Sequence, residues 1–152
     1  MGTVSVKTWS ELTSTEVYAI ARLRTEVFLR EQRCDDEELD WRDLEPGTEH
    51  YLLQDAGDAA VASYLRVLRQ EVPGDVDAPL IIGRVCTDPD HRGKGLASRL
   101  LAEVIARHGG EPMLLHAQLY ATGLYANAGF SPVGEQFEEA GISHIAMVRP
   151  AD

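Results

Sequence analysis

Cysteine is scarce in this sequence of 152 residues, where only Cys34 and Cys86 occur. Two cysteines this far apart match neither the spacing of a zinc site nor the dense framework of small disulfide-bonded domains. We therefore expect no metal site and no disulfide scaffold. Cys86 is predicted to be a small core residue, and Cys34 a free thiol near the surface.

Long apolar runs are also missing. No stretch approaches the length of a membrane span, and residues 1–9 lack the basic and apolar regions of a signal peptide. The cytoplasm is therefore the expected location, with no membrane partner. The hydrophobic fraction of 44% is nevertheless ordinary, and the length suits one domain, residues 1–152, with its own core.

Positive charge is in short supply, because 14 Lys and Arg face 25 Asp and Glu, a net charge of −11. This balance argues against nucleic acids and anionic membranes as partners. Nine of the acids lie within residues 31–49, against only Arg33 and Arg42. Two interpretations of this acidic segment stay open: a solvated surface, which is the usual role of a charge run, or a lip that attracts a cationic amine.

Hydrophobic periodicity predicts an α/β (α+β) chain of about six to seven strands in a mixed, mostly antiparallel sheet flanked by helices. Thr13 and Glu16 form a capping box that begins the first helix. The expected order is β-α-α-β-β-β-α-β-α-β-β. The second helix in this order stands for the acidic segment, which is expected to be either a short helix or a loop. Strands are expected at residues 4–8, 50–54, 59–69, 81–87, 112–116, 130–137 and 142–148, helices at 13–28, 96–108 and 118–128, and a loop at 71–79.

One stretch combines a strand, a glycine loop and a helix start. The apolar run at residues 81–87 breaks at Asp88-Pro89 and passes through Gly93 and Gly95 into a helical spacing of leucines. The first turn of a helix has N–H groups without intrahelical partners, and glycine lets an anion approach them closely. The stretch therefore predicts a phosphate-binding loop.

Two common phosphate-binding motifs do not fit this loop. A dinucleotide fingerprint would need a third glycine where Ser98 stands, and an acidic residue about twenty positions later. The loop of nucleoside triphosphatases would need Gly-Lys-Ser/Thr at a later offset, which is absent. Nicotinamide dinucleotide binding is therefore a weak alternative.

The loop resembles that of the GNAT superfamily of acyl-CoA-dependent N-acetyltransferases, since Arg92-x-x-Gly95-x-Ala97 matches its Gln/Arg-x-x-Gly-x-Gly/Ala motif. The resemblance implies a GNAT-like fold with acetyl-CoA as co-substrate. The preceding strand would pair with the pantetheine arm through Val85, Cys86 and Thr87. The residues expected at the CoA pyrophosphate are Arg92, Gly93, Lys94, Gly95, Leu96, Ala97 and Ser98, the first six through their backbone amides.

Further motifs resemble the ElaA-type branch of that superfamily, and they span nearly the whole chain. Two departures lie on the acceptor side: Asp35-Asp36 stands where the branch often has Pro-Tyr, and Ala140-Gly141-Ile142-Ser143-His144 where it has Asp-Gly-Ile-Pro-His. The matching motifs are Leu23-Arg24-x-x-Val27-Phe28-x-x-Glu31-Gln32-x-Cys34, Ile82-Gly83-Arg84-Val85, His116-Ala117-Gln118, Tyr125-x-x-x-Gly129-Phe130 and Glu135-x-Phe137-x-Glu139-x-Gly141-Ile142-x-His144.

Acyl transfer to an amine needs a base for the amine proton and an acid for the leaving thiolate. The resemblance implies Tyr125 as the general acid, and a phenol of pKa about 10 can protonate a thiolate of about 8.5 only slightly uphill. Tyr120 is expected to be structural, and Arg84 to pair with the acidic segment. His116 and Glu38 are the first candidates for the base, beside Asp40, Glu138 and His144.

Two functions remain from the sequence. The first is an N-acetyltransferase that acts on the primary amine of a small molecule or peptide, by direct attack in a ternary complex. The second is a module that senses acyl-CoA without turnover. Neither needs nucleic acid, and the sequence allows a monomer or a homodimer.

Overall fold

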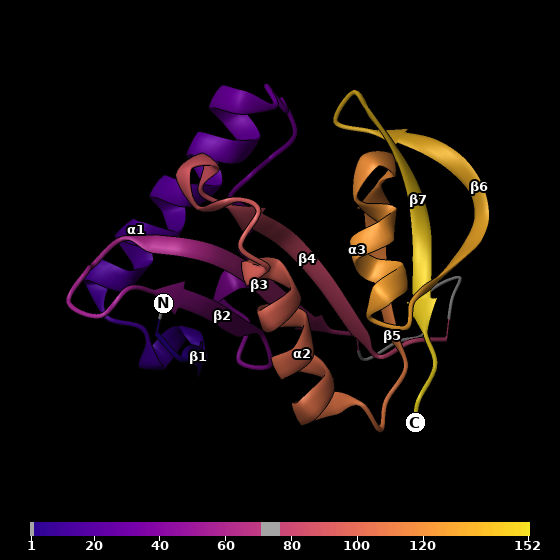
Figure 1. Cartoon of the computed structure of the whole chain (residues 1–152), viewed down its shortest axis with the longest axis horizontal. Helices are drawn as coiled ribbons and strands as arrows, with labels where there is room; N and C mark the ends of the chain where they lie inside the picture. Colours follow the sequence, from indigo (N-terminus) through magenta and orange to yellow (C-terminus); the bar gives the residue numbers. More distant parts are fainter. Residues whose placement is uncertain (1, 71–76) are drawn as a thin grey trace.

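The computed structural model describes residues 2–70 and 77–152, and its centre is one seven-stranded sheet (Figure 1). The strand order is β1-β2-β3-β4-β5-β7-β6, in which only β4 and β5 pair in parallel. The mixed, mostly antiparallel sheet expected from the sequence is confirmed. The strands are β1 (Val4–Lys7), β2 (Glu49–Gln54), β3 (Val61–Arg69), β4 (Leu80–Thr87), β5 (Met113–Gln118), β6 (Ser131–Glu139) and β7 (Ile142–Arg149).

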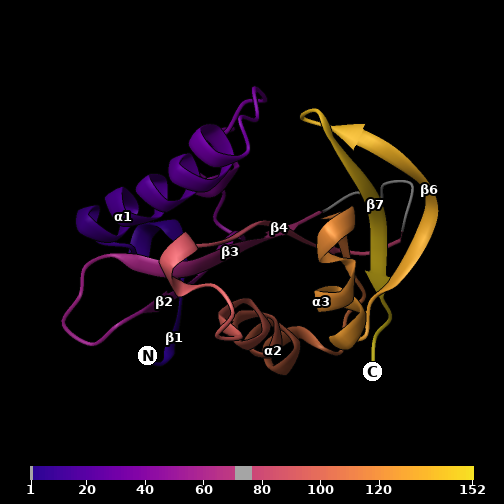
Figure 2. The same ribbon diagram turned by 45° about the horizontal axis from the view of Figure 1, so that its top comes forward.

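Helices cover both faces of the sheet. Figure 2 shows α1 (Ser14–Arg24) on one side, and α2 (Leu96–His108) and α3 (Thr122–Asn127) on the other. The end of the sheet formed by β6 and β7 curls towards the α1 side (Figure 2). The described ranges also contain four short 3₁₀ turns: η1 (Trp9–Glu11), η3 (Arg42–Leu44), η4 (Pro89–His91) and η5 (Leu119–Ala121).

The first helix begins where the sequence predicts. The Thr13 side chain accepts a hydrogen bond from the Glu16 N–H at 3.1 Å, and the Glu16 carboxylate accepts one from the Thr13 N–H at 2.9 Å. After Arg24 the helix widens into a π-helical segment, η2 (Thr25–Glu31), in which the Gln32 N–H donates to the Val27 carbonyl at 2.9 Å. The acidic segment that follows is a loop with the single turn η3, so the short second helix considered for it does not form.

Two apolar clusters pack on opposite faces of the sheet. The larger lies under α2 and α3 and contains Leu65, Leu100 and Leu115, while the smaller lies under α1 and contains Leu23, Tyr64 and Cys86. Because β3 is buried on both faces, it alternates between the two clusters, as expected for a central strand covered by helices. Both cysteines are free, with Cys86 buried and Cys34 half-buried.

Some predicted boundaries were wrong. The strand expected at residues 112–116 runs on to Gln118, because β7 pairs with it as far as His144. The helix expected from residue 118 therefore begins only at Thr122, after the turn η5. Most of the loop expected at 71–79 lies outside the described residues. In the described part of the chain, no helix has both the length and the apolar character to cross a membrane.

Candidate active site

The site begins where β4 and β5 separate. Their pairing ends at Ile82 and Leu115, although β4 continues to Thr87 and β5 to Gln118. A bulge drives β4 away: its pairing with β3 skips a residue here, and Arg84 has a φ of 54°. A bulge bends the strand that carries it and increases the local twist. The result is a cleft of about 700 Å³ between the diverging strands.

The cleft is lined from both faces of the sheet. Leu124 and Tyr125 of α3 come from one side, and Val27 and Phe28 of η2 come from the other. The wall opposite η2 is the turn after β6, with Ala140. The cleft therefore forms a passage through the gap between the strands, from α3 on one face of the sheet to η2 on the other, and its two ends are called mouths below.

A glycine loop precedes α2 at one mouth. Gly93 and Gly95 have φ values of 78° and 72°, and Gly95 caps the helix. The Arg99 N–H is the first to bond back into the helix, to the Gly95 carbonyl at 3.1 Å. The preceding N–H groups of the first turn are thus open to an anion, whose charge the positive end of the helix dipole favours.

The two basic side chains of the loop behave differently. Arg92 forms a bidentate ion pair with Glu31 of η2, with Nη1 2.6 Å from Oε2, and Arg92 Nε donates to the Thr87 carbonyl at 3.2 Å. Lys94 is exposed. Arg92 therefore ties the loop to η2 and to the end of β4, while Lys94 extends into solvent.

Tyr125 is a buried aromatic residue of α3 on the wall of the cleft. Its ring meets Phe130 edge-on with centroids 6.2 Å apart, and Gly129, with a φ of 96°, turns the chain between them. Among the described residues, its hydroxyl has no hydrogen-bond partner. Burial raises the pKa of Tyr125 well above its usual range, so the phenol stays protonated and is a weaker acid than a free tyrosine.

Three arginines from other elements form ion pairs with the acidic segment. Arg24 of α1, only 2% exposed, reaches Glu38 Oε2 with Nε at 2.6 Å and Asp43 Oδ1 with Nη1 at 2.7 Å. Arg66 of β3 forms a pair with Asp40 at 2.6 Å and shares Asp43 at 3.0 Å. Three guanidinium groups, counting Arg84, thus neutralise three carboxylates.

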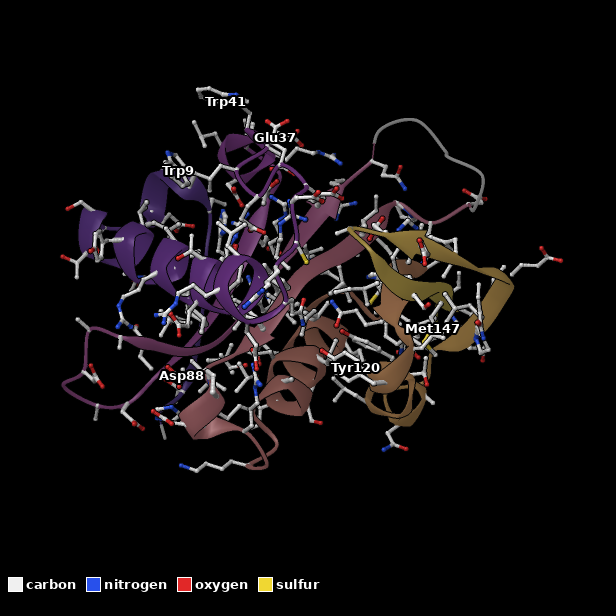
Figure 3. All side chains as sticks on the ribbon, turned by 90° about the horizontal axis from the view of Figure 1, so that it is seen from above. Trp9, Glu37, Trp41, Asp88, Tyr120 and Met147 are labelled. Carbon is white, nitrogen blue, oxygen red and sulfur yellow. The ribbon has the colours of Figure 1, made fainter. Side chains whose placement is uncertain are left out.

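Arg84 links the acidic segment to the bulge. Its Nε donates to Glu38 Oε2 at 3.0 Å, and its Nη2 donates to the carbonyls of Glu37 and Glu38, each at 3.1 Å. The pairing expected from the sequence is confirmed. Asp36, Glu37 and Glu38 line the cleft, whereas Asp40 does not. In Figure 3 Glu37 lies on this segment, with exposed Trp41 at the outer edge.

Another wall of the cleft carries two of the base candidates from the sequence, His116 and His144, together with Glu139, which the sequence offered only within a motif. His116 of β5, Glu139 of β6 and His144 of β7 all line the cleft, but Glu138 does not. Ala140 and Gly141, with φ values of 53° and 77°, form the tight turn that brings Glu139 and His144 together. No three His, Cys, Asp or Glu side chains in the described ranges are arranged to hold a metal ion.

The predicted cofactor residues fall into two groups. Val85, Cys86, Thr87, Arg92 and Ala97 line the cleft. Gly93, Lys94, Gly95, Leu96 and Ser98 do not line it, but form the loop and first turn between Arg92 and Ala97. The side chain of Leu96 belongs to the core, so only its backbone is available to a ligand. Their contact with a cofactor stays a prediction.

Sequence reasoning missed a bridge across the cleft. The side-chain amides of Gln32 and Gln118 exchange two hydrogen bonds, at 3.2 and 2.9 Å, and Gln32 also donates to the Tyr120 hydroxyl at 3.2 Å. Tyr120, 78% exposed, lies between the two halves of the sheet in Figure 3. Both glutamines belong to the motifs matched in the sequence, but those motifs assigned no role to either residue.

Comparison with known proteins decides the family. Residues 11–150 match the acetyltransferase (GNAT) domain. The chain belongs to the GNAT acetyltransferase family. A UPF0039 protein of Mycobacterium tuberculosis is 39% identical over 145 residues, which cover 95% of this chain and 91% of that protein.

Two solved structures agree with this GNAT assignment. An acyl-CoA N-acyltransferase from Pseudomonas aeruginosa superposes with a TM-score of 0.82 and 35% identity, over 96% of this chain and 98% of that one. Escherichia coli ElaA has a TM-score of 0.84 and 30% identity, with the same coverage. The chain is therefore a GNAT acyltransferase of the ElaA-type branch, and its family takes the acyl group from an acyl-CoA.

Proposed function

We propose that this GNAT protein transfers an acetyl group from acetyl-CoA to the primary amine of a small-molecule or peptide acceptor, by direct attack in a ternary complex. The observation that carries the proposal is the passage through the sheet between β4 and β5. One mouth adjoins the glycine loop, and the other adjoins the acidic segment. Two reactants entering from opposite faces would meet inside the sheet, which supports direct transfer without an acyl-enzyme.

The donor would lie along β4. The CoA pyrophosphate would sit on the backbone amides of residues 92–97, with Ser98 beside them, and the pantetheine arm would pair with the free edge of Val85, Cys86 and Thr87. Because β5 has left this edge, the backbone N–H groups there are free to face the thioester carbonyl. They would stabilise the oxyanion that forms in the transition state.

The acceptor would approach as a cation. Since Arg24, Arg66 and Arg84 neutralise Glu38, Asp40 and Asp43, the uncompensated charge of the acidic segment at the cleft comes from Asp36 and Glu37. Two carboxylates at the rim attract an ammonium group and raise the local concentration of a cationic substrate. This uncompensated charge favours the interpretation of the acidic segment as a lip that attracts a cationic amine over its interpretation as a solvated surface.

Tyr125 would protonate the departing thiolate. Its raised pKa makes proton transfer more uphill than for an ordinary phenol, but keeps the hydroxyl protonated and able to donate at all physiological pH values. A hydrogen bond from its hydroxyl to the thiolate would be charge-assisted, and therefore stronger than one between neutral groups.

A thiol-release assay with acetyl-CoA tests the function over polyamines, aminosugars, amino acids and short peptides, with neutral and anionic amines for comparison. We expect turnover with a cationic amine, and Tyr125→Phe should lower kcat about 10²-fold with little change in the KM for acetyl-CoA. Tyr18→Phe, a change at an exposed tyrosine of α1, is the matched control. Tight acetyl-CoA binding without transfer to any amine would favour the sensor function instead.

A further inference from the structure

Three side chains, two of them candidates for the base, form a cluster on the proposed acceptor side of the sheet. Residues 116, 137 and 144 lie on the same face of β5, β6 and β7. The His116 ring meets Phe137 edge-on at 5.0 Å, and Phe137 stacks on His144 at 5.9 Å with an interplanar angle of 22°. Aromatic packing therefore holds both imidazoles at the wall of the cleft.

The carboxylate of Glu139 lies between the two imidazoles. Its Oε1 is 3.2 Å from His116 Nδ1, and its Oε2 is 3.7 Å from His144 Nε2. His144 is in turn anchored, because its Nδ1 donates to the Ile142 carbonyl at 2.7 Å. A carboxylate accepts hydrogen bonds only, so Nδ1 of His116 carries the proton and Nε2 keeps a free lone pair.

We propose that His116 is the general base of the amine acylation and that Glu139 is the residue that positions it. The inference rests on the proposed N-acyltransfer. The ammonium group of the acceptor first loses a proton to water at the cleft. As the resulting neutral amine attacks, its nitrogen forms a bond to the thioester carbon, and His116 Nε2 takes the second proton that the nitrogen loses. The C–S bond breaks, and Tyr125 gives its proton to the thiolate. The imidazolium then returns a proton to the tyrosinate through water.

The other candidate from the sequence, Glu38, is poorly suited to this task. Its Oε2 accepts from Arg24 Nε at 2.6 Å and from Arg84 Nε at 3.0 Å. If this carboxylate took a proton, it would lose the negative charge that strengthens both hydrogen bonds. His116 faces no arginine within ion-pair distance in the described part of the chain.

Several elements bring other ionisable groups to the cleft, and burial raises the pKa of one of them, Tyr125. These groups are Cys34, Asp36, Glu37 and Glu38 of the acidic segment, Arg66, Arg84 and Cys86 of β3 and β4, Arg92 of the glycine loop, and Tyr120 and Tyr125 beyond β5.

Steady-state kinetics with acetyl-CoA and an accepted amine between pH 5 and 9 test the proposal. We expect His116→Gln to lower kcat at pH 7 by about 10²- to 10⁴-fold, and to leave the KM for acetyl-CoA within about twofold. It should also remove one unit of slope from the acid limb of log kcat/KM, because one ionisation is lost. Glu139→Gln should lower kcat by about 10- to 100-fold, and Glu139→Asp should restore part of it.

A control and a second readout separate positioning from folding. Glu135→Gln changes an exposed glutamate of the same strand and should leave the kinetics unchanged. Nitrogen-15 NMR should find neutral His116 protonated at Nδ1 in the unmodified protein, with the Nε2-protonated form gaining population in Glu139→Gln.

Turnover by His116→Gln within threefold of the unmodified protein, with its acid limb intact, would overturn the inference and leave the proposed function standing. An unchanged tautomer and kcat in Glu139→Gln would overturn the role of Glu139. Failure of the unmodified protein to acylate any amine would remove the proposed function, and the base with it.

Discussion

Replacing Arg24 by methionine tests whether the acidic segment is held by buried charge. Arg24 stands on the apolar face of α1, yet is only 2% exposed and donates to Glu38 and Asp43. Its guanidinium carbon also lies 5.8 Å from the centre of the Tyr64 ring. Methionine fills a similar volume but removes the charge and all the donors, so the cluster of three cations and three anions loses one cation.

The cost follows from what remains. Breaking a buried ion pair by removing one partner costs about 3 to 5 kcal/mol. Both carboxylates keep a second arginine, Asp43 through Arg66 and Glu38 through Arg84, so the lower end of this range applies. We expect the free energy of unfolding to fall by about 3 kcal/mol, and Tm to fall by about 6 to 12 °C for a domain of this size.

Urea unfolding followed by circular dichroism measures the change. Arg22→Met, at an exposed position on the opposite side of the same helix, is the control and should cost less than about 0.5 kcal/mol. Adding Glu38→Gln to Arg24→Met rebalances the charge, so the double variant should lose at least about 1 kcal/mol less than the sum of the single changes. A loss below about 1 kcal/mol in Arg24→Met, or strict additivity, would refute the argument.

Three other outcomes are expected. The Arg66 guanidinium holds the pKa of Asp40 well below its usual range. The stability that Asp40 contributes is therefore complete above about pH 4 and is lost as the pH falls further. Urea unfolding between pH 5 and 2 should show a steeper loss of stability in the unmodified protein than in Arg66→Met. Thr13→Ala removes the cap of α1 and should lower the free energy of unfolding by about 1 kcal/mol in the same assay, and no change would contradict the capping role. Gly95→Ala should cost about 1 to 2 kcal/mol because φ is 72°, and should weaken acetyl-CoA binding in calorimetry, whereas Gly110→Ala should bind normally.

Local chemistry explains what could be predicted from the sequence. The capping box at Thr13, the strand–loop–helix signal around Gly93 and Gly95, and the apolar alternation of residues 61–69 each depend on near neighbours in the chain. Such signals are visible in one sequence because the interacting groups are a few residues apart. They sufficed for the fold class, and their offsets led to the family.

The features that were not predicted depend on distant residues. The pairing of Arg84 with the acidic segment was expected, but the other two guanidinium groups that neutralise this segment come from α1 and β3, between 14 and 26 residues away. The bulge that opens the cleft lies at Arg84. This arginine has a positive φ, which is uncommon for a residue other than glycine and which the local sequence does not predict. The Gln32–Gln118 bridge spans 86 residues.

Arg84 takes part both in the bulge and in the contacts of the acidic segment. Its backbone carries the bulge by which β4 leaves β5, and its side chain holds the carbonyls of Glu37 and Glu38. The strand edge proposed for the donor and the carboxylates proposed for the acceptor are thereby contacted by the same residue. A positive φ costs energy at a non-glycine residue, and the ion pair with Glu38 offsets part of that cost. We therefore expect a change in the acidic segment to alter the strand that would hold the thioester.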